Sequence, residues 1–190
     1  MKKTLIAAAV LATLTTPLTA FALDTGDLVV RAGLATVAPN EDSDAIPGLP
    51  INLPNGVKVE NDTQLGLTVT YMFAQKWGLG LLASTPFSHD IKLADANVRV
   101  GDTKHLPPTL TVQYFPLGGR ETVQPYFGLG LNYTTFFSES TTSEFENTLG
   151  TIFGTGGPVR ADLKLKDSWG VALEAGVDVP IDEHWMFNAA

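Results

Sequence analysis

The chain of 190 residues contains no cysteine, which excludes disulfide frameworks, cysteine nucleophiles and thiolate metal sites. Basic residues are few: 12 Lys and Arg stand against 20 Asp and Glu, and the net charge of −8 argues against a nucleic-acid-binding patch. Outside the N-terminus no apolar run reaches about 18 residues, so a helical membrane protein is not expected. A helical period of apolar positions is also lacking, and we expect an all-β protein.

The N-terminus, residues 1–22, has the features of a secretory signal peptide. Lys2 and Lys3 give it a positive start, an apolar core follows over residues 5–14, and Ala20-Phe21-Ala22 fits a cleavage site of the A-x-A type. We therefore expect an exported protein in which residues 23–190 form one domain.

Strands are indicated by apolar and polar residues that alternate with a period of two. Six runs show this pattern, at residues 28–37, 63–73, 77–87, 105–115, 125–137 and 168–179, and a seventh begins near His184. In the third run we expect Phe87 on the same face as Trp77. The long connections between runs carry no further predicted strand or helix.

The connections measure about 25, 3, 17, 9, 30 and 4 residues, the alternation of long and short that distinguishes an outer-membrane barrel from a soluble sandwich. The fold expected is a transmembrane, antiparallel up-and-down β-barrel with its short turns in the periplasm. Such barrels have even strand numbers, with eight the smallest usual count. With six full strands and part of a seventh, we expect a barrel that is incomplete at its C-terminus.

One face of each run is apolar and the other mixes polar residues with glycine. In a bilayer the apolar faces must point outward, with an aromatic girdle near the strand ends. We assign the girdle to Tyr71, Phe73, Trp77, Tyr114, Phe127, Phe137, Trp169 and Trp185. The expected channel lining is Arg31, Gln64, Thr68, Met72, Leu82, Thr111, Phe115, Glu174 and Asp178. The inward glycines either leave space for a thin conduit or only permit strongly coiled strands.

Three prolines lie in the third and fourth runs, at Pro86, Pro107 and Pro108. Proline cannot donate to a strand ladder, so both partners of this hairpin lose hydrogen bonds at a similar height. The prolines predict either a lateral opening between the two strands or a simple strand boundary.

Charged residues suggest two further features. Arg31 should meet Glu174 or Asp178 inside the barrel, because a buried charge requires a partner, and the pair is either a structural plug or a selectivity filter. His89 and His105 flank one long loop and could bind a metal, but histidines at a rim are usually solvated, and we expect no metal or other cofactor.

Several segments resemble the OmpW family of small outer-membrane proteins, which includes OprG. The matching residues are 31–33 with 35–37, 61–68, 83–87 with 89, 105–109, 125–126 with 128, 130 and 132–137, 165–170, and 176–178. The resemblance implies an eight-stranded barrel in the cell outer membrane, with a narrow, largely apolar channel that passes small or hydrophobic molecules, sideways into the membrane in one view. It also implies a closing final strand, which this sequence lacks.

The partners expected from this reading are outer-membrane lipids and lipopolysaccharide, small hydrophobic or amino-acid-like solutes, and the barrel-assembly machinery, with no nucleic acid. Two other classes remain open. An exported lipocalin-like carrier also has eight strands, but its apolar faces point inward. The second class is a barrel enzyme or receptor. For an enzyme, the one candidate catalytic group is His89 with Ser84 or Ser88 and Asp90. We expect no enzyme.

Overall fold

The computed structural model describes residues 23–40, 56–96, 98–118, 123–182 and 184–190, so the expected signal peptide lies outside the described residues. The elements, in chain order, are β1 (Leu28–Val37), β2 (Val57–Val59), β3 (Asp62–Ala74), β4 (Trp77–Ser84), β5 (Phe87–Leu93), β6 (Arg99–Leu106), β7 (Thr109–Tyr114), β8 (Gln124–Thr141), α1 (Ser143–Phe153), β9 (Ser168–Pro180) and β10 (Met186–Ala189). Within these ranges, no helix has the length and apolar character needed to cross a membrane.

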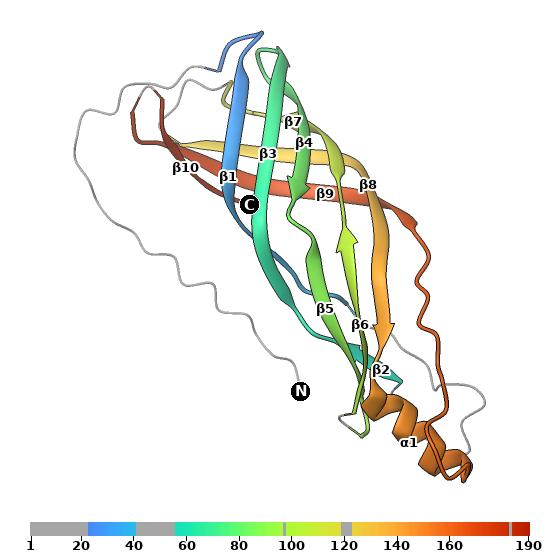
Figure 1. Ribbon diagram of the computed structural model, residues 1–190. Coiled ribbons are helices and arrows are strands. Elements are labelled where there is room, and N and C mark those ends of the chain that lie inside the picture. The colour runs from blue at the N-terminus through green and yellow to red at the C-terminus, as the bar shows by residue number, and fades with distance from the viewer. Residues whose placement is uncertain (1–22, 41–55, 97, 119–122, 183) are drawn as a thin grey trace.

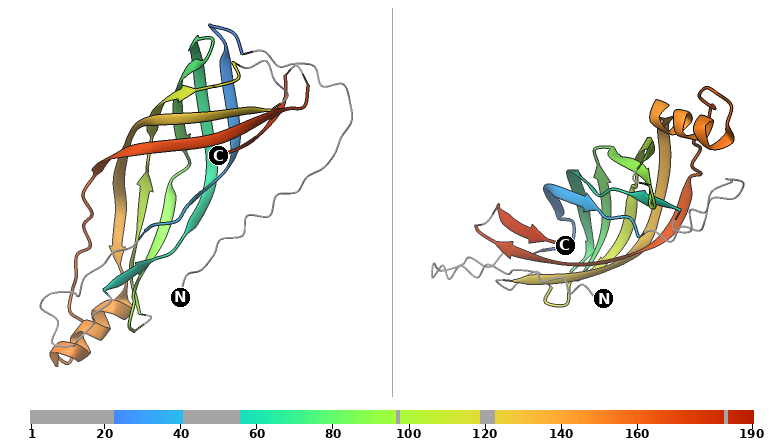
Figure 2. Two further views of the ribbon diagram at one scale, coloured as in Figure 1. Left: turned by 180° about the vertical axis from the view of Figure 1, so that it is seen from behind. Right: turned by 90° about the horizontal axis from the view of Figure 1, so that it is seen from below.

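The strands form one curved antiparallel sheet, which Figure 2 shows from two further directions. The strand order through the membrane-facing part is β1-β3-β4-β7-β8-β9-β10. β8 is the longest strand and connects two parts of the sheet, because its first half pairs with β7 and its second half with β6. Among the described residues, β1 and β10 each pair with a single strand and form two edges of the sheet.

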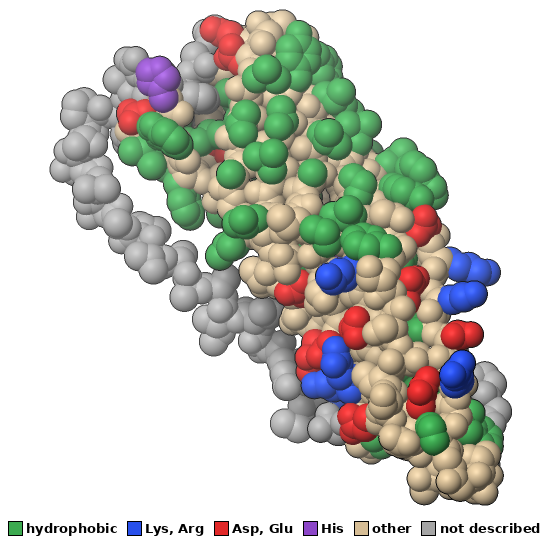
Figure 3. Space-filling view, viewed as in Figure 1, with side chains coloured by type: hydrophobic (Ala, Val, Ile, Leu, Met, Phe, Trp, Pro, Cys, Tyr) green, Lys and Arg blue, Asp and Glu red, His purple; other side chains and the backbone are tan. Residues whose placement is uncertain are grey.

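The two ends of the sheet differ, as the connection lengths predict (Figure 1). The β3–β4 turn, the chain after β7 and the β9–β10 turn lie at one end, which we name the short-turn end. The opposite end, named the long-loop end, carries β2, the β5–β6 hairpin and α1. Figure 3 shows apolar side chains over the part of the visible face nearer the short-turn end, and the Lys, Arg, Asp and Glu side chains visible there gather mainly toward the long-loop end.

The two faces of the sheet divide as the alternation predicts. Leu173 is 84% exposed and the neighbouring outward positions are also apolar, whereas Arg31, one residue after an exposed valine, is 7% exposed. The outward-facing leucines, valines and aromatics form an apolar band, which we define by Leu34, Leu65, Leu67, Leu79, Leu81, Leu110, Val112, Leu129, Leu131, Val171 and Leu173. A soluble carrier would bury these residues.

The third and fourth predicted strands are each interrupted, which corrects the expectation of two continuous runs. The third divides into β4 and β5 around Pro86, and the fourth divides into β6 and β7 at Pro107 and Pro108. The alternation shifts across the first interruption, so Phe87 is buried although Trp77 and the other odd-numbered residues of β4 are exposed. The prediction for Phe87 was therefore wrong, because a period of two cannot be carried through a proline break.

The long connections contain regular structure that the sequence analysis did not predict. β2, β5 and β6 extend the sheet beyond the apolar band, and α1 is a helix where no helical period was found. Thr142 caps α1 by accepting a 3.2 Å hydrogen bond from the Phe145 backbone N–H, and Gly154 ends it in the left-handed conformation at φ 66°. These are ordinary helix start and stop signals, but a helix of three turns gives only a weak periodic pattern.

Candidate functional site: the barrel interior and an interrupted ladder

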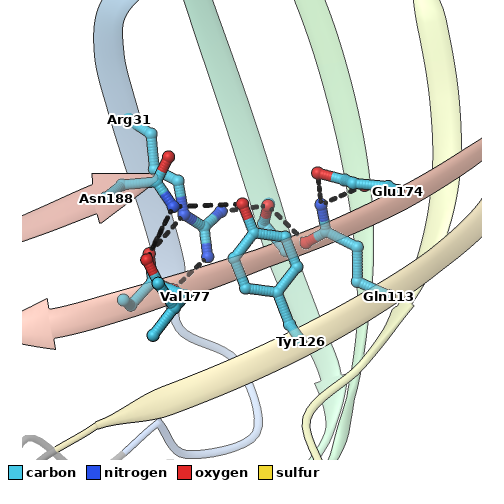
Figure 4. A network of polar contacts seen from close by, with 8 residues as sticks. Arg31, Gln113, Tyr126, Glu174, Val177 and Asn188 are labelled. Atoms are coloured by element: carbon cyan, nitrogen blue, oxygen red, sulfur yellow. Dashed lines mark hydrogen bonds and ion pairs between the residues drawn. The ribbon is translucent and has the colours of Figure 1, made fainter. Parts of the chain in front are cut away.

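A network of polar side chains fills the interior of the short-turn half (Figure 4). Arg31 on β1 donates to both carboxylate oxygens of Asp178 on β9, at 2.9 and 2.6 Å, and to the Thr70 hydroxyl on β3 at 2.9 Å. The guanidinium carbon also lies 4.8 Å from the centre of the Tyr126 ring. The expected ion pair is therefore present, and both side chains are buried.

The second expected carboxylate, Glu174, does not pair with Arg31. Its oxygens accept from the Gln113 amide at 3.0 and 2.9 Å and from the Thr111 hydroxyl at 2.9 Å. Thr70 donates to the Gln113 carbonyl oxygen at 2.9 Å, and this bond connects the glutamate to the arginine. Asn188 on β10 donates to Asp178 and Tyr126, so the network reaches across from β1 to the last strand.

Inward-facing glycines provide the room for this network. A Cβ on Gly80 would lie 2.7 Å from the Gln113 amide nitrogen, and one on Gly128 would lie 2.6 Å from a Glu174 oxygen. Gly176 is equally close to the Tyr126 hydroxyl, at 2.5 Å. The space that these glycines leave is occupied by network side chains, and this part of the barrel is packed.

An apolar cluster closes the short-turn end beneath the network. Leu23, Val29, Met72, Phe115 and Tyr126 are buried against one another, with Met186 packed at their side. Met72 and Phe115 were expected to line a channel, but both are fully buried in this cluster, which we name the floor. Together the floor and the polar network occupy the interior near the short turns.

The remaining predicted lining residues lie at different depths. Thr111 and Asp178 are buried in the network, while Gln64, Thr68 and Glu174 are half-buried. Leu82 is 37% exposed and stands at the last pair of the β4–β7 ladder, opposite Thr109. The sequence analysis missed Thr70, Gln113, Tyr126, Asn132 and Asn188, although the first four occupy inward positions of the same alternation.

The predicted proline positions coincide with an interruption in the strand ladder. The β4–β7 ladder ends at the pair Leu82 and Thr109, and the β5–β6 ladder begins at the pair Phe87 and His105. In the described chain, no ladder pair joins residues 83–86 to residues 106–108. We name this interruption the ladder gap, and it holds Pro86, Pro107 and Pro108.

Each side of the ladder gap is bonded to the strand behind it. The Thr85 amide donates to the Leu65 carbonyl of β3 at 2.9 Å, and the Thr85 hydroxyl donates to Gln64 at 2.9 Å. On the other side, the Tyr133 amide of β8 donates to the Pro108 carbonyl at 3.0 Å, and the Asn132 amide donates to the Pro107 carbonyl at 3.1 Å. The gap therefore separates two well-supported sheet portions.

Two histidines lie just beyond the ladder gap and are not solvated, contrary to expectation. His89 is 2% exposed and His105 is 7% exposed, and their rings stack with centroids 4.8 Å apart. Phe87 and Phe136 pack on the same pair, at 5.4 and 5.6 Å from His105. Across the described ranges, no three His, Asp or Glu side chains are grouped to hold a metal ion.

The candidate catalytic group is not assembled. His89 faces the buried side of β5, whereas Ser88 and Asp90 occupy the alternate positions on the other side. Asp90 is paired with Arg99 at 2.7 Å. Asp62, at the start of β3, accepts hydrogen bonds from the Ser88 backbone N–H at 2.7 Å and the Gln64 amide at 2.8 Å, which hold the pKa of Asp62 below its usual value.

Aromatic residues expected in the girdle lie on the outer surface at both limits of the apolar band. Six of the eight are exposed, and Tyr114 and Phe137 are half-buried. Trp77 packs on Tyr114 at 4.8 Å near the short-turn end, and Trp169 packs on Tyr133 at 4.7 Å near the other limit. Rings at these two levels suit the interfaces of a bilayer.

Known proteins have similar sequences. The sequence pattern of the OmpW family matches residues 24–190. Outer membrane protein W of Vibrio cholerae is 44% identical over 194 residues, covering 100% of this chain and 82% of that protein. Outer membrane protein W of Escherichia coli is 41% identical over 188 residues, covering 99% and 81% respectively.

A solved structure extends the likeness to three dimensions. The crystal structure of the outer membrane protein OprG from Pseudomonas aeruginosa superposes with a TM-score of 0.73 at 44% identity, covering 88% of this chain and 77% of that chain. The curved sheet thus has the β-barrel fold of outer-membrane proteins. The chain belongs to the OmpW family of outer-membrane proteins.

Proposed function

We propose that the protein carries small, mainly apolar solutes across the outer leaflet and releases them sideways into the membrane through the ladder gap. The observation that carries this proposal is the missing ladder between residues 83–86 and 106–108. In a closed barrel each strand is hydrogen-bonded to its neighbours. Two strands can therefore separate with the smallest loss of hydrogen bonds where the ladder between them is missing.

The side chains packed in the short-turn half favour an exit through the side wall over an exit along the barrel axis. A solute that enters at the long-loop end meets the Arg31–Asp178 network and then the floor of Leu23, Met72 and Phe115. Passage through both would break a buried ion pair and leave its charges without partners. The side wall therefore offers the easier path.

The position of the ladder gap, between the apolar band and the charged region, also fits the release of solutes into lipid. Leu81 and Leu110, the pair just below the gap's border, are exposed members of the apolar band. Beyond the gap, Lys104 and the Arg99 ion pairs begin the charged region. An apolar solute leaving here would enter hydrocarbon close to the polar boundary of the membrane.

Replacement of both Pro107 and Pro108 by alanine tests the proposal, because it restores the two backbone N–H donors that the residues of the gap lack. We expect slower uptake of a small uncharged apolar dye into vesicles whose outer leaflet contains lipopolysaccharide, measured against protein-free vesicles. The matched control is Pro116→Ala at the short-turn end, which should take up dye at the original rate. Unchanged uptake in the double variant would remove the ladder gap as the exit.

A further inference from the structure

The stacked histidines His89 and His105 have a feature that the proposed transport path does not use. Both are more than nine-tenths buried. Within the described part of the chain, His89 Nε2 and His105 Nδ1 are buried nitrogens without a hydrogen-bond partner. Buried polar atoms usually find partners, so two orphan nitrogens in one aromatic stack call for a functional explanation.

The bonding of His89 fixes where its proton sits. Its Nδ1 contacts the backbone carbonyl of Glu60, which can only accept, so Nδ1 carries the hydrogen in the neutral ring. Nε2 is then a bare lone pair. Protonation of Nε2 would create a charged N–H donor that faces no acceptor, and the ring could stay charged only by moving.

His105 faces the same restriction. A proton on Nδ1 would again be a buried donor with no partner, directly against a second imidazole. Burial and the neighbouring His89 lower the pKa of His105, while the charge of Asp62 acts in the opposite direction. The lowered pKa of His105 favours its neutral ring near pH 7, and this ring takes up a proton only under acidic conditions.

The surroundings offer little to offset a new positive charge. β8 contributes Phe136, which has no charge, and β6 contributes buried Thr103 beside the pair. Asp90, Lys92, Asp102 and Lys104 occupy the alternate, opposite-facing positions of β5 and β6, and the Glu60 carboxylate is bound by Lys92. Among the described residues, Asp62 on β3 is the carboxylate whose charge acts on both His89 and His105, and it already accepts three hydrogen bonds.

The position of the pair connects it to the ladder gap. Phe87 and His105 form the first ladder pair beyond the gap, and His89 lies diagonally across from His105. A proton on either ring would place a charge inside the stack of Phe87, His89, His105 and Phe136 that supports this first pair. When the pair opens, the unpaired stretch of wall becomes longer.

We propose that His89 and His105 form a proton-sensitive latch at the ladder gap, which is closed near neutral pH and opens in acid. The latch rests on the proposed lateral exit, because it controls the length of that exit. In acid, the imidazolium rings separate, the Phe87–His105 pair is lost, and apolar solutes leave the barrel faster.

The test combines dye uptake with hydrogen exchange on the full chain in vesicles at pH 7.5 and pH 4.5, about one unit above and about two units below the ordinary histidine pKa, because the pKa of His105 is lowered. The variants are His105→Phe and His89→Phe, which keep an aromatic ring but cannot titrate. His184→Phe is the control, because His184 is the third histidine and lies exposed in the β9–β10 turn. The dye is uncharged, so its own partition does not change with pH.

We expect wild type and His184→Phe to take up dye several-fold faster at the lower pH, with lower protection factors for amides 87–89 and 103–106. His105→Phe should lose both effects. Loss of protection in acid without any dye uptake at either pH would keep the latch and remove the proposed transport. Wild-type uptake and protection that do not change with pH, or an acid effect that survives in both phenylalanine variants, would overturn the latch. Imidazole NMR pKa values at or above the ordinary value would overturn it independently.

Discussion

At the scale of single residues, a buried ion pair connects two strands across the interior. Arg31 and Asp178 come from strands that are remote in the sequence, and each is buried against the other. Such a pair adds little net stability compared with apolar residues, but the loss of one partner leaves an uncompensated buried charge. The pair therefore fixes how β1 and β9 face each other across the interior.

We predict that Arg31→Met destabilises the barrel by about 3 to 5 kcal/mol, because the buried Asp178 carboxyl group loses its charged partner. Urea unfolding in micelles, followed by heat-modifiable gel mobility, measures the change. The double variant Arg31→Met, Asp178→Asn should recover much of the loss. Lys92→Met provides the control, since it breaks an exposed pair with Glu60 and should cost about 1 kcal/mol or less. Equal losses in Arg31→Met and Lys92→Met would contradict the buried role of Arg31.

The sequence predicts which residues face inward, but it does not predict their individual partners. Alternation places Arg31, Glu174 and Asp178 on interior faces, and burial requires a counter-charge for the arginine. The choice of Asp178 over Glu174 depends on the relative heights of β1 and β9, and on Gln113 and Thr111, which take the Glu174 oxygens instead. Register between remote strands is a property of the folded barrel.

At the scale of elements, Asn132 compensates for the two prolines of the ladder gap. Its side-chain amide donates to the Pro107 carbonyl at 3.1 Å and to the Thr109 hydroxyl at 2.8 Å. Thr134 donates to its carbonyl oxygen at 2.7 Å and holds the side chain in place. These bonds attach the break between β6 and β7 to β8 and leave the opposite side of the break unpaired.

We predict that Asn132→Ala weakens this attachment by about 1 kcal/mol, the usual net value of a hydrogen bond, and raises exchange of the Tyr133 amide about fivefold. Hydrogen exchange in micelles measures it, because the Tyr133 amide donates to the Pro108 carbonyl. Asn147→Ala, on the exposed side of α1, should leave that exchange rate unchanged. A Tyr133 amide that exchanges at the original rate in Asn132→Ala would show that the prolines are held without the side chain.

The six alternating runs and the start of a seventh all correspond to strands, two of them interrupted at prolines, because a period of two is a strong signal where one face meets lipid. The signal weakens at the long-loop end. There β5 and β6 carry charges on one face and histidines on the other, and α1 begins at a threonine cap rather than at an apolar repeat. Proline breaks also hide strand ends, because a single residue changes which face the next strand buries.

At the scale of the whole molecule, the fold depends on an exterior that only a bilayer can cover. We predict that Leu173→Arg, in the apolar band, destabilises the membrane-inserted barrel by about 2 to 4 kcal/mol, the cost of a basic side chain near the bilayer centre. Urea unfolding in lipid vesicles measures this change. Phe153→Arg is the control, since Phe153 is also an exposed apolar residue but lies on α1, away from the band. A similar effect for both variants would contradict the placement of the band.

The account depends most on the ladder gap as the exit for solutes, and a reversible lock tests it directly. The chain has no cysteine, so Ser84→Cys with Leu106→Cys places one pair of thiols across the gap. We predict that a short bis-thiosulfonate linker stops dye uptake and that a reductant restores it. The same linker on Leu81→Cys with Leu110→Cys, which are already ladder partners, should leave uptake unchanged. Full uptake through a locked gap would show that solutes leave the barrel by another route.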